Sequence, residues 1–272
     1  MIRFSVDFTL TAVLAVLLGV SLVLDKETDR EEVSTPIAEK LVTKQAWELA
    51  GVPDFTAIND VKQKKQTFFS YILPMVEQEN KEILAHRARL VALSHKEELA
   101  AEDKIWLSRI GGDYRLGNKL DSVWFAEMLL RVDVIPPSLA LAQAANESGW
   151  GTSRFAREGN NYFGQWCFLK GCGLVPNSRT EGFTHEVRKF DDVNGSVRAY
   201  IKNLNTHAQY QSLRELRANA RFNGMTITGA YIAQGLGKYS ERGSVYVDEI
   251  VQMIHGNRLA RFDKTIDVVR EG

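Results

Sequence analysis

The sequence has no net charge with which to attract a polyanion. Its 34 lysines and arginines balance 34 aspartates and glutamates over 272 residues, and no long basic run is visible. An excess of positive charge, spread over the chain or gathered in a patch, is what draws a protein to nucleic acid. The sequence therefore predicts no nucleic-acid partner.

Metal-ligating residues are also scarce. Only two cysteines and five scattered histidines occur, and no histidine pair near the cysteines completes a tetrahedral ligand set. No convincing Ser-His-Asp order is present, which argues against a triad hydrolase. The two cysteines, Cys167 and Cys172, lie in a glycine-flanked stretch. Two free thiols and a short-loop disulfide both fit, and the disulfide is favoured if this part of the chain lies outside the cytoplasm.

One apolar run of nearly membrane length stands at the N-terminus, where residues 8–24 carry no charge. About 20 apolar residues cross a bilayer, so this run is at the short end. Arg3 precedes it and an acid-rich stretch follows, which favours an N-terminus in the cytoplasm and the rest of the chain outside. Because no small-residue cleavage site ends the run, we expect residues 1–24 to form an uncleaved signal anchor. A cleaved signal peptide is the alternative.

The chain after the anchor divides by composition. Residues 25–50 are polar and are interpreted as a linker. Residues 51–114 mix long charged side chains with apolar ones at helical spacing, which predicts a helical arm. Residues 115–262 are long enough for one catalytic domain, and residues 263–272 remain as a tail.

Proline and glycine mark the expected element boundaries. Pro74 is expected to start or kink a helix, and Gly111-Gly112 to break the chain. A short helix is expected over 121–132. The next begins at Pro136-Pro137 and ends at Gly149. The sequence further predicts a small β-hairpin lobe within 160–192, a helix capped by Asp192 or Asn194 with an apolar stripe ending at Leu204, and a last helix over 245–254.

Glu147 is the candidate catalytic acid. It ends an alanine-rich apolar helix, where partial removal from water would disfavour the charged carboxylate and raise its pKa. Cleavage of a glycosidic bond needs such a group, still protonated near neutral pH, to donate a proton to the leaving oxygen. Nearby aromatic rings could cover the apolar faces of sugar rings, although ordinary core packing is an equal alternative for each of Trp150, Tyr162, Phe163 and Trp166.

The stretch AQAANESGWGTSRFAREGNNYFGQW carries a family resemblance. It is similar to the signature of the glucosaminidase domain of glycoside hydrolase family 73, in which a helix ending in Glu-Ser-x-x-Gly is followed by Asn-x-Phe-Gly. Here these motifs are residues 147–151 and 161–164. The resemblance covers residues 115 to 262, and the whole chain resembles the Bax-type bacterial proteins, a group related to flagellar peptidoglycan hydrolases.

The resemblance implies a mainly α, lysozyme-like α+β fold with a β-lobe beside the cleft, and no metal or organic cofactor. Glu147 takes the position of the family's general acid. Glu181 is the best match to a second acidic residue, with Glu186, Asp191 and Asp192 as rivals. The family's late tyrosine corresponds to Tyr239, and Tyr246 is expected to serve packing. The residues expected to bind substrate are Trp150, Asn161, Tyr162, Phe163, Gln165 and Trp166.

Three functions compete on this basis. The first is a peptidoglycan hydrolase, an endo-β-N-acetylglucosaminidase that cleaves the β-1,4 bonds of glycan strands. It would be held in the inner membrane by a single pass, with its catalytic domain in the periplasm. The second is a muramidase or lytic transglycosylase on the same fold. The third is a non-catalytic peptidoglycan-binding scaffold. The sequence does not identify any protein partner.

Overall fold

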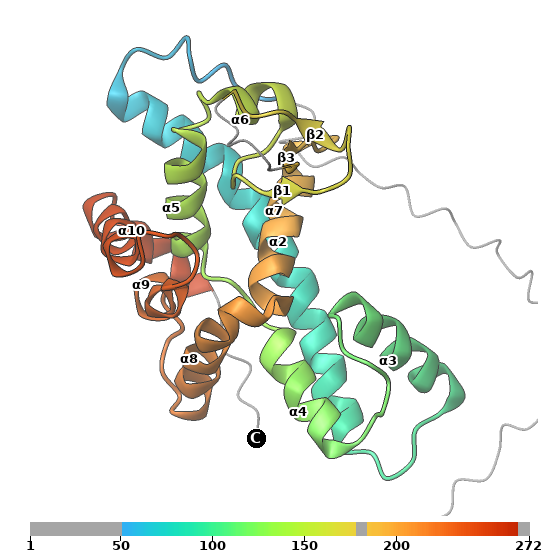
Figure 1. Cartoon of the computed structure of the whole chain (residues 1–272). Helices are drawn as coiled ribbons and strands as arrows, with labels where there is room; N and C mark the ends of the chain where they lie inside the picture. Colours follow the sequence, from blue (N-terminus) through green and yellow to red (C-terminus); the bar gives the residue numbers. More distant parts are fainter. Residues whose placement is uncertain (1–50, 178–183, 266–272) are drawn as a thin grey trace, which may run out of the picture. The chain divides into compact units, whose positions relative to one another are not determined.

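The computed structural model describes residues 51–177 and 184–265, which are mainly helical (Figure 1). The predicted anchor and linker and the candidate Glu181 lie outside the described residues. Within the described part of the chain, no helix is both long enough and apolar enough to cross a membrane.

The long helix α2 (Val61–Ser94) forms most of the predicted arm. Its N-terminus is capped by Asp60, whose Oδ1 accepts a hydrogen bond from the Gln63 backbone N–H at 2.7 Å. Pro74 lies inside this helix and starts no new one, contrary to one of the two expectations for it. Ile72 and Met75 on either side of Pro74 are fully buried, so tertiary packing holds the helix together across the missing N–H.

Helix α3 (Ala101–Asp113) corrects the expected glycine break, because Gly111 and Gly112 are both helical. A Cβ on Gly111 would lie 2.9 Å from the carbonyl oxygen of Leu116 and 3.0 Å from the Trp124 ring. Gly111 therefore serves the close approach of the chain that follows, and the helix ends after it.

Four further helices agree with the sequence-based expectations. These are α4 (Ser122–Arg131), α5 (Pro137–Ser148), α7 (Val193–Thr206) and α10 (Ser244–Gly256). Asp192, and not Asn194, caps α7 by accepting from the Gly195 N–H at 2.7 Å. The helical elements that we did not predict are α6 (Arg154–Gly159), α8 (Gln211–Phe222), α9 (Gly229–Ile232), and the 3₁₀ helices η1 (Ala208–Tyr210), η2 (Ala233–Leu236) and η3 (Leu259–Thr265).

The β-lobe is a three-stranded antiparallel sheet, slightly larger than the expected hairpin. Its strands β1 (Trp166–Cys167), β2 (Gly173–Leu174) and β3 (Glu186–Arg188) are arranged in the order β1-β3-β2. Trp166 pairs with Val187, and Gly173 pairs with Arg188. A Cβ on Gly173 would lie 2.0 Å from the Val187 carbonyl oxygen, so only glycine allows this strand to approach.

Helix α5 lies at the centre of the hydrophobic core. Its residues 139–142 are completely buried, and α2, α9, α10 and η3 all pack against it. Phe68 and Ile72 of α2 belong to the same cluster as Leu139 of α5, so the predicted arm and the predicted catalytic range share one core. The folded part also continues past residue 262, because Asp263 is buried and accepts hydrogen bonds from Ser138.

A buried ionic cluster ties α2 and α8 to the chain segment between α4 and α5. Asp133 lies 3.5 Å from Arg87 and 3.6 Å from Arg217, and it also pairs with Arg221. Burial alone would raise the pKa of Asp133, but Arg217 and the other two arginines outweigh burial and hold that pKa below its ordinary value. The guanidinium of Arg217 also donates to the carbonyl oxygens of Leu130 and Asp133.

Replacing this carboxylate with an amide is expected to destabilise the fold strongly. Asp133→Asn leaves buried arginines without their counter-charge, at a cost of about 3–5 kcal/mol in the free energy of unfolding. Urea unfolding followed by circular dichroism measures the change. The matched control is Asp113→Asn, which removes an exposed pair with Lys202 and should cost less than about 1 kcal/mol. Equal losses in the two variants would contradict the assigned role of the cluster.

Candidate active site

Glu147 stands in the last turn of α5, and the sequence after it explains why the helix ends there. Gly149 adopts a left-handed conformation (φ 55°) as the C-cap of α5. Ser148 donates to the Ala144 carbonyl oxygen at 2.6 Å and accepts from the Gly151 N–H at 2.8 Å, which fixes the turn. A Cβ on Gly151 would lie 2.3 Å from the Phe55 ring, so this position requires glycine.

The Glu147 carboxyl lies in the wall of a cavity of about 470 Å³, a volume within the range of small-molecule sites. The wall is built from the end of α5, the turn that leads into β1 with Trp166 of that strand, residues of α7 and η1, and the segment before α10 together with Tyr246 of that helix. Its lining residues are Asn146, Glu147, Phe163, Gly164, Gln165, Trp166, Asn203, Tyr210, Tyr239, Ser240, Arg242 and Tyr246.

Burial raises the pKa of the Glu147 carboxyl above its ordinary value of 4.5. Three contacts act in the other direction: the Tyr246 hydroxyl donates to Oε1 at 2.8 Å, Asn146 donates a further hydrogen bond, and Arg242 contributes positive charge. Burial outweighs them. The direction of the shift is the one that a proton donor working near neutral pH requires.

A chain of hydrogen bonds behind Glu147 sets the direction of the Tyr246 proton. The hydroxyl of Tyr200 donates to Gln143 Oε1 at 2.6 Å, and Gln143 Nε2 donates to the Tyr246 oxygen at 2.8 Å. Because that oxygen already accepts from the amide, the Tyr246 proton points to the carboxyl. Gln143 is fully buried, so the chain is shielded from water.

Tyr246 is buried in the core, as the packing expectation has it, and it makes a further contact that was not expected. It contacts the Glu147 carboxyl directly, whereas Tyr239 stacks on the Tyr246 ring at 5.2 Å between centroids. The Tyr239 hydroxyl donates to the Phe163 carbonyl oxygen at 3.4 Å. Tyr239 therefore lines the cavity, as expected of a site residue, but it forms no direct hydrogen bond to Glu147.

The expected substrate-binding residues fall into two groups. Phe163, Gln165 and Trp166 line the cavity. Asn161 is buried beside it, accepting from the Phe163 and Gln165 N–H groups and donating to the carbonyl oxygens of Gln165 and Arg188, so that it holds the turn in shape.

Trp150 and Tyr162 lie away from the cavity. The Trp150 ring packs edge-on against Phe68 and Phe69 of α2, and Tyr162 is buried against Phe68. For these two rings the packing alternative is the correct one. The reversal of the chain at Gly149 and Gly151 carries Trp150 to the α2 side of α5.

Other cavity residues were not anticipated from the sequence. Four of the five come from α7, η1 and the segment before α10, so only the fold brings them to Glu147, whereas Asn146 precedes Glu147 on α5. Two of them could have been suggested by their position in the sequence. Asn146 is next to the candidate acid, and Arg242 lies three residues after the candidate Tyr239. The unpredicted lining residues are Asn146, Asn203, Tyr210, Ser240 and Arg242.

Among the described cavity-lining residues, Glu147 is the single carboxylate. Glu186, a rival for the second acidic position, is buried and accepts from the Gly171 and Gly173 N–H groups. Asp192 caps α7. Glu186 and Asp192 therefore have structural roles.

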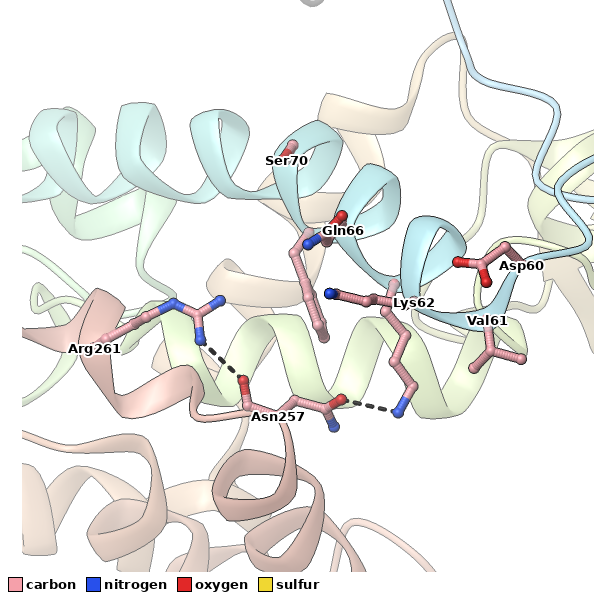
Figure 2. A pocket seen from close by; sticks show the side chains of 9 residues that line it. Asp60, Val61, Lys62, Gln66, Ser70, Asn257 and Arg261 are labelled. Atoms are coloured by element: carbon pink, nitrogen blue, oxygen red, sulfur yellow. Dashed lines mark hydrogen bonds between the residues drawn. The ribbon is translucent and has the colours of Figure 1, made fainter.

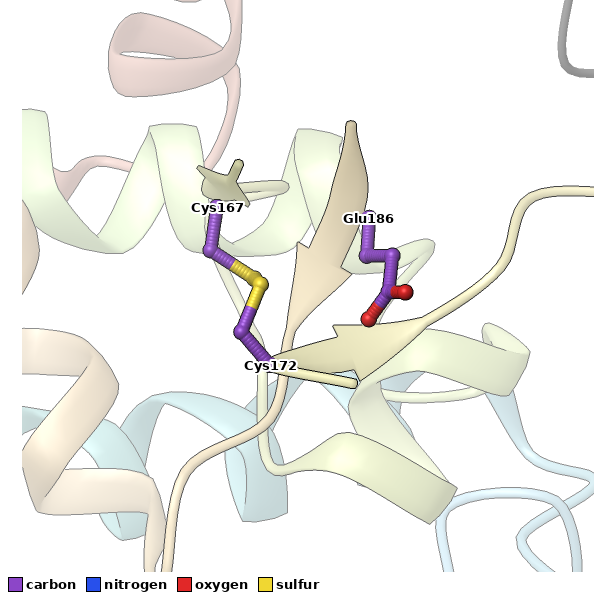
Figure 3. A group of neighbouring side chains, drawn as sticks. All are labelled: Cys167, Cys172 and Glu186. Carbon is purple, nitrogen blue, oxygen red and sulfur yellow. A yellow bond between two sulfur atoms is a disulfide. The ribbon is translucent and has the colours of Figure 1, made fainter. Parts of the chain in front are cut away.

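The cysteines form a disulfide beside Glu186 (Figure 3). Within the described ranges, Cys167, Cys172 and Glu186 form the one group of three acidic, histidine or cysteine side chains close enough to share a metal ion. The sulfurs are bonded to each other and the carboxylate is engaged by two backbone amides, so this group does not fit a metal.

A second cavity, of about 580 Å³, lies between the start of α2 and residues 257–261 (Figure 2). Lys62, Lys65 and Arg261 give it a basic lining, and Lys65 Nζ donates to Asn257 Oδ1 at 3.0 Å. Its only lining carboxylate among the described residues is Asp60, which caps α2. It therefore offers no proton donor comparable to Glu147.

Sequence comparison places this fold and site in a known class. The family described as mannosyl-glycoprotein endo-β-N-acetylglucosaminidase matches residues 124–259, a range that contains the whole Glu147 cavity. The chain belongs to this glucosaminidase family, whose members are glycoside hydrolases. It is also 32% identical over 212 residues to the protein bax of Escherichia coli (strain K12), covering 77% of this chain and 75% of that protein. No solved structure matches the chain.

The hydrogen bond from Tyr246 predicts how the Glu147 carboxyl titrates. We expect Glu147 to titrate above 4.5 in the native protein, and higher still in Tyr246→Phe, because the lost O–H stabilised the ionised form. Carbon-13 NMR of labelled glutamate side chains measures both. Tyr239→Phe is the control, since its hydroxyl bonds to a backbone carbonyl, and it should shift the Glu147 pKa less. An equal or larger shift in the control would contradict this assignment.

Proposed function

We propose that the protein is an endo-β-N-acetylglucosaminidase that hydrolyses the β-1,4 bonds of peptidoglycan glycan strands, with Glu147 as the general acid. Membership of the glucosaminidase family supports the class of reaction. The observation that carries the assignment is the carboxyl of Glu147, which lies in a cavity wall, is partly withdrawn from water and is oriented by Tyr246.

The two oxygens of the Glu147 carboxyl have different surroundings. Oε1 accepts from Tyr246, whereas a Cβ on Gly164 would lie 3.7 Å from Oε2. Gly164 has no side chain and a positive φ of 63°, so it leaves space beside Oε2. We assign the transferable proton to Oε2, from which it passes to the glycosidic oxygen as the bond to the sugar breaks.

The attack on the sugar carbon has two routes. In the first, Glu181 acts as a base on water, which would place the carboxyls about 6.5–9.5 Å apart in an inverting enzyme. In the second, the acetamido group of the substrate attacks, and Tyr239 in the cavity wall positions it. We favour Glu181 because it is the best match to the second acidic residue of the family, and its rivals Glu186 and Asp192 are engaged by backbone N–H groups.

We further propose that the protein is anchored in the inner membrane by residues 1–24, with its catalytic domain in the periplasm. The disulfide between Cys167 and Cys172 supports a location outside the reducing cytoplasm. Peptidoglycan occupies the same compartment, so the proposed anchor would hold the enzyme beside its substrate.

Glu147→Gln is expected to lower the rate of peptidoglycan hydrolysis by at least about 100-fold, because the amide cannot supply the proton. Release of soluble fragments from purified cell walls measures the rate. Glu181→Gln should also lose about 100-fold if it activates water. Glu158→Gln, which removes only an exposed pair with Arg154, should keep wild-type activity and serves as the matched control.

Full activity of Glu147→Gln would overturn the site assignment. Full activity of Glu181→Gln would favour attack by the acetamido group. The absence of hydrolysis by the folded wild-type protein would instead favour a peptidoglycan-binding scaffold.

The identity of the bond cut is expected to appear in the products. Mass spectrometry of reduced muropeptides should find N-acetylglucosamine at the new reducing ends. N-acetylmuramic acid at those ends would identify a muramidase, and anhydro-muropeptides would identify a lytic transglycosylase. Either result would reject the proposed specificity while keeping Glu147 as the acid.

A further inference from the structure

The loop between the two cysteines exposes large apolar side chains at the protein surface. Phe168 is 73% exposed and Leu169 is 79% exposed, and the preceding Trp166 is 57% exposed. We call residues 166–172 the disulfide loop. Three neighbouring apolar side chains on one short loop form a patch of the kind that marks interaction sites on proteins.

The disulfide loop is held in shape by several independent contacts. The Cys167–Cys172 disulfide closes it, and the Cys172 N–H donates to the Leu169 carbonyl oxygen at 3.1 Å. Behind it, the buried Glu186 carboxylate accepts from the Gly171 N–H at 2.9 Å and the Gly173 N–H at 2.8 Å (Figure 3). With its ends and backbone fixed, the loop has little freedom to fold its apolar side chains back against the protein.

The patch is continuous with the candidate active site. Trp166 lines the Glu147 cavity, and its ring stacks on His185 at 4.0 Å between centroids and 15° between planes. Strand β1 ends at Cys167, whose sulfur is bonded to Cys172, and the exposed Phe168 and Leu169 follow it directly in the chain. The exposed apolar side chains of the loop therefore begin in the cavity wall, at Trp166, and continue along the chain to Phe168 and Leu169.

We propose that the disulfide loop is a binding platform for the glycan strand outside the cleft, with sugar rings resting on Trp166 and Phe168 and flanked by Leu169. This inference rests on the proposed function. A cavity of about 470 Å³ holds only a short piece of a glycan strand. A strand with one bond at Glu147 must therefore continue over the edge of the cavity, where the partly exposed Trp166 lies. Flat apolar rings match the apolar faces of sugars.

The disulfide makes this platform sensitive to the redox state of the protein. Reduction by dithiothreitol converts the disulfide to two thiols while the reagent is oxidised to its cyclic disulfide. The loop then loses its closure, although the Glu186 contacts remain, and substrate binding weakens. Since Phe168 and Leu169 do not line the Glu147 cavity, the loss should appear in KM and leave kcat nearly unchanged.

The test compares two exposed phenylalanines in the full-length protein. Phe168→Ala should raise KM for purified glycan strands about 5–10-fold with kcat changed less than about 2-fold, the size expected for an anchoring ring at a binding surface. Phe222→Ala is the matched control, because Phe222 is 91% exposed at the end of α8 and does not line the cavity. Its KM should equal that of the wild type.

A second arm tests the disulfide. Cys167→Ser/Cys172→Ser should raise KM about as much as Phe168→Ala, and circular dichroism should show the same helical content as the wild type. Dithiothreitol should raise the KM of the wild-type protein and leave that of the double variant unchanged, which separates loop opening from other effects of the reagent.

A third measurement is independent of turnover. In the Glu147→Gln background, co-sedimentation with insoluble peptidoglycan should fall about 5–10-fold on adding Phe168→Ala and stay constant on adding Phe222→Ala. Equal retention of the two variants, or equal KM values, would overturn the platform. An inactive wild type that still loses retention through Phe168→Ala would reject the proposed function and keep the platform.

Discussion

The burial of helix α5 is the constraint on which the rest of the structure depends. Its alanines allow α2, α9, α10 and η3 to approach closely, but a helix buried over most of its length must satisfy the polar groups that it withdraws from water. At its N-terminus, the Asp263 carboxylate accepts from the backbone N–H and the hydroxyl of Ser138. At its C-terminus, Ser148 and Gly149 complete the cap. The Glu147 carboxyl, the proposed acid, lies in the last turn, next to the C-terminal cap.

The Glu147 site can be understood as a balance between burial and one hydrogen-bonded chain. Burial favours the protonated carboxyl, whereas the Tyr246 hydroxyl favours the ionised one. Because the folded pKa lies above the unfolded value, this group stabilises the fold fully below the unfolded pKa, and the contribution is lost as the pH rises through the folded pKa. In the proposed mechanism the protonated carboxyl is the active form, and it is also the form that the fold prefers, so activity and this contribution to stability change with pH in the same direction.

Proline, glycine and capping residues predicted the ends of some helices correctly, but Pro74 and Gly111-Gly112 lie inside helices that packing maintains. Pro137 and Gly149 bound α5, and Asp192 caps α7, as expected. Helix α8 was missed because part of its buried face is arginine: Arg217 is completely buried and satisfied by Asp133 and backbone carbonyls, yet a pattern based on apolar side chains treats it as a surface residue. Such a helix can be recognised only when its partners are known.

The same limit explains which part of the site was found. Glu147 stood out because it ends a largely apolar helix. The turn that follows it was also predictable, because Ser148, Gly149 and Gly151 are adjacent in the sequence. Tyr246 did not stand out, because its neighbours Val247 and Ile250 form an ordinary buried stripe on α10. The carboxylate oxygen that accepts its hydrogen bond belongs to Glu147, 99 residues earlier in the chain. Gln143 held the available clue. A buried amide side chain needs a partner for its oxygen and another for its nitrogen. Here the partners of Gln143 are the hydroxyls of Tyr200 and Tyr246, which come from other helices. A buried glutamine on a helix beside a candidate acid therefore predicts hydrogen-bonding partners from other elements. In this protein those partners are two tyrosines, and the bond from Gln143 directs the Tyr246 proton to Glu147.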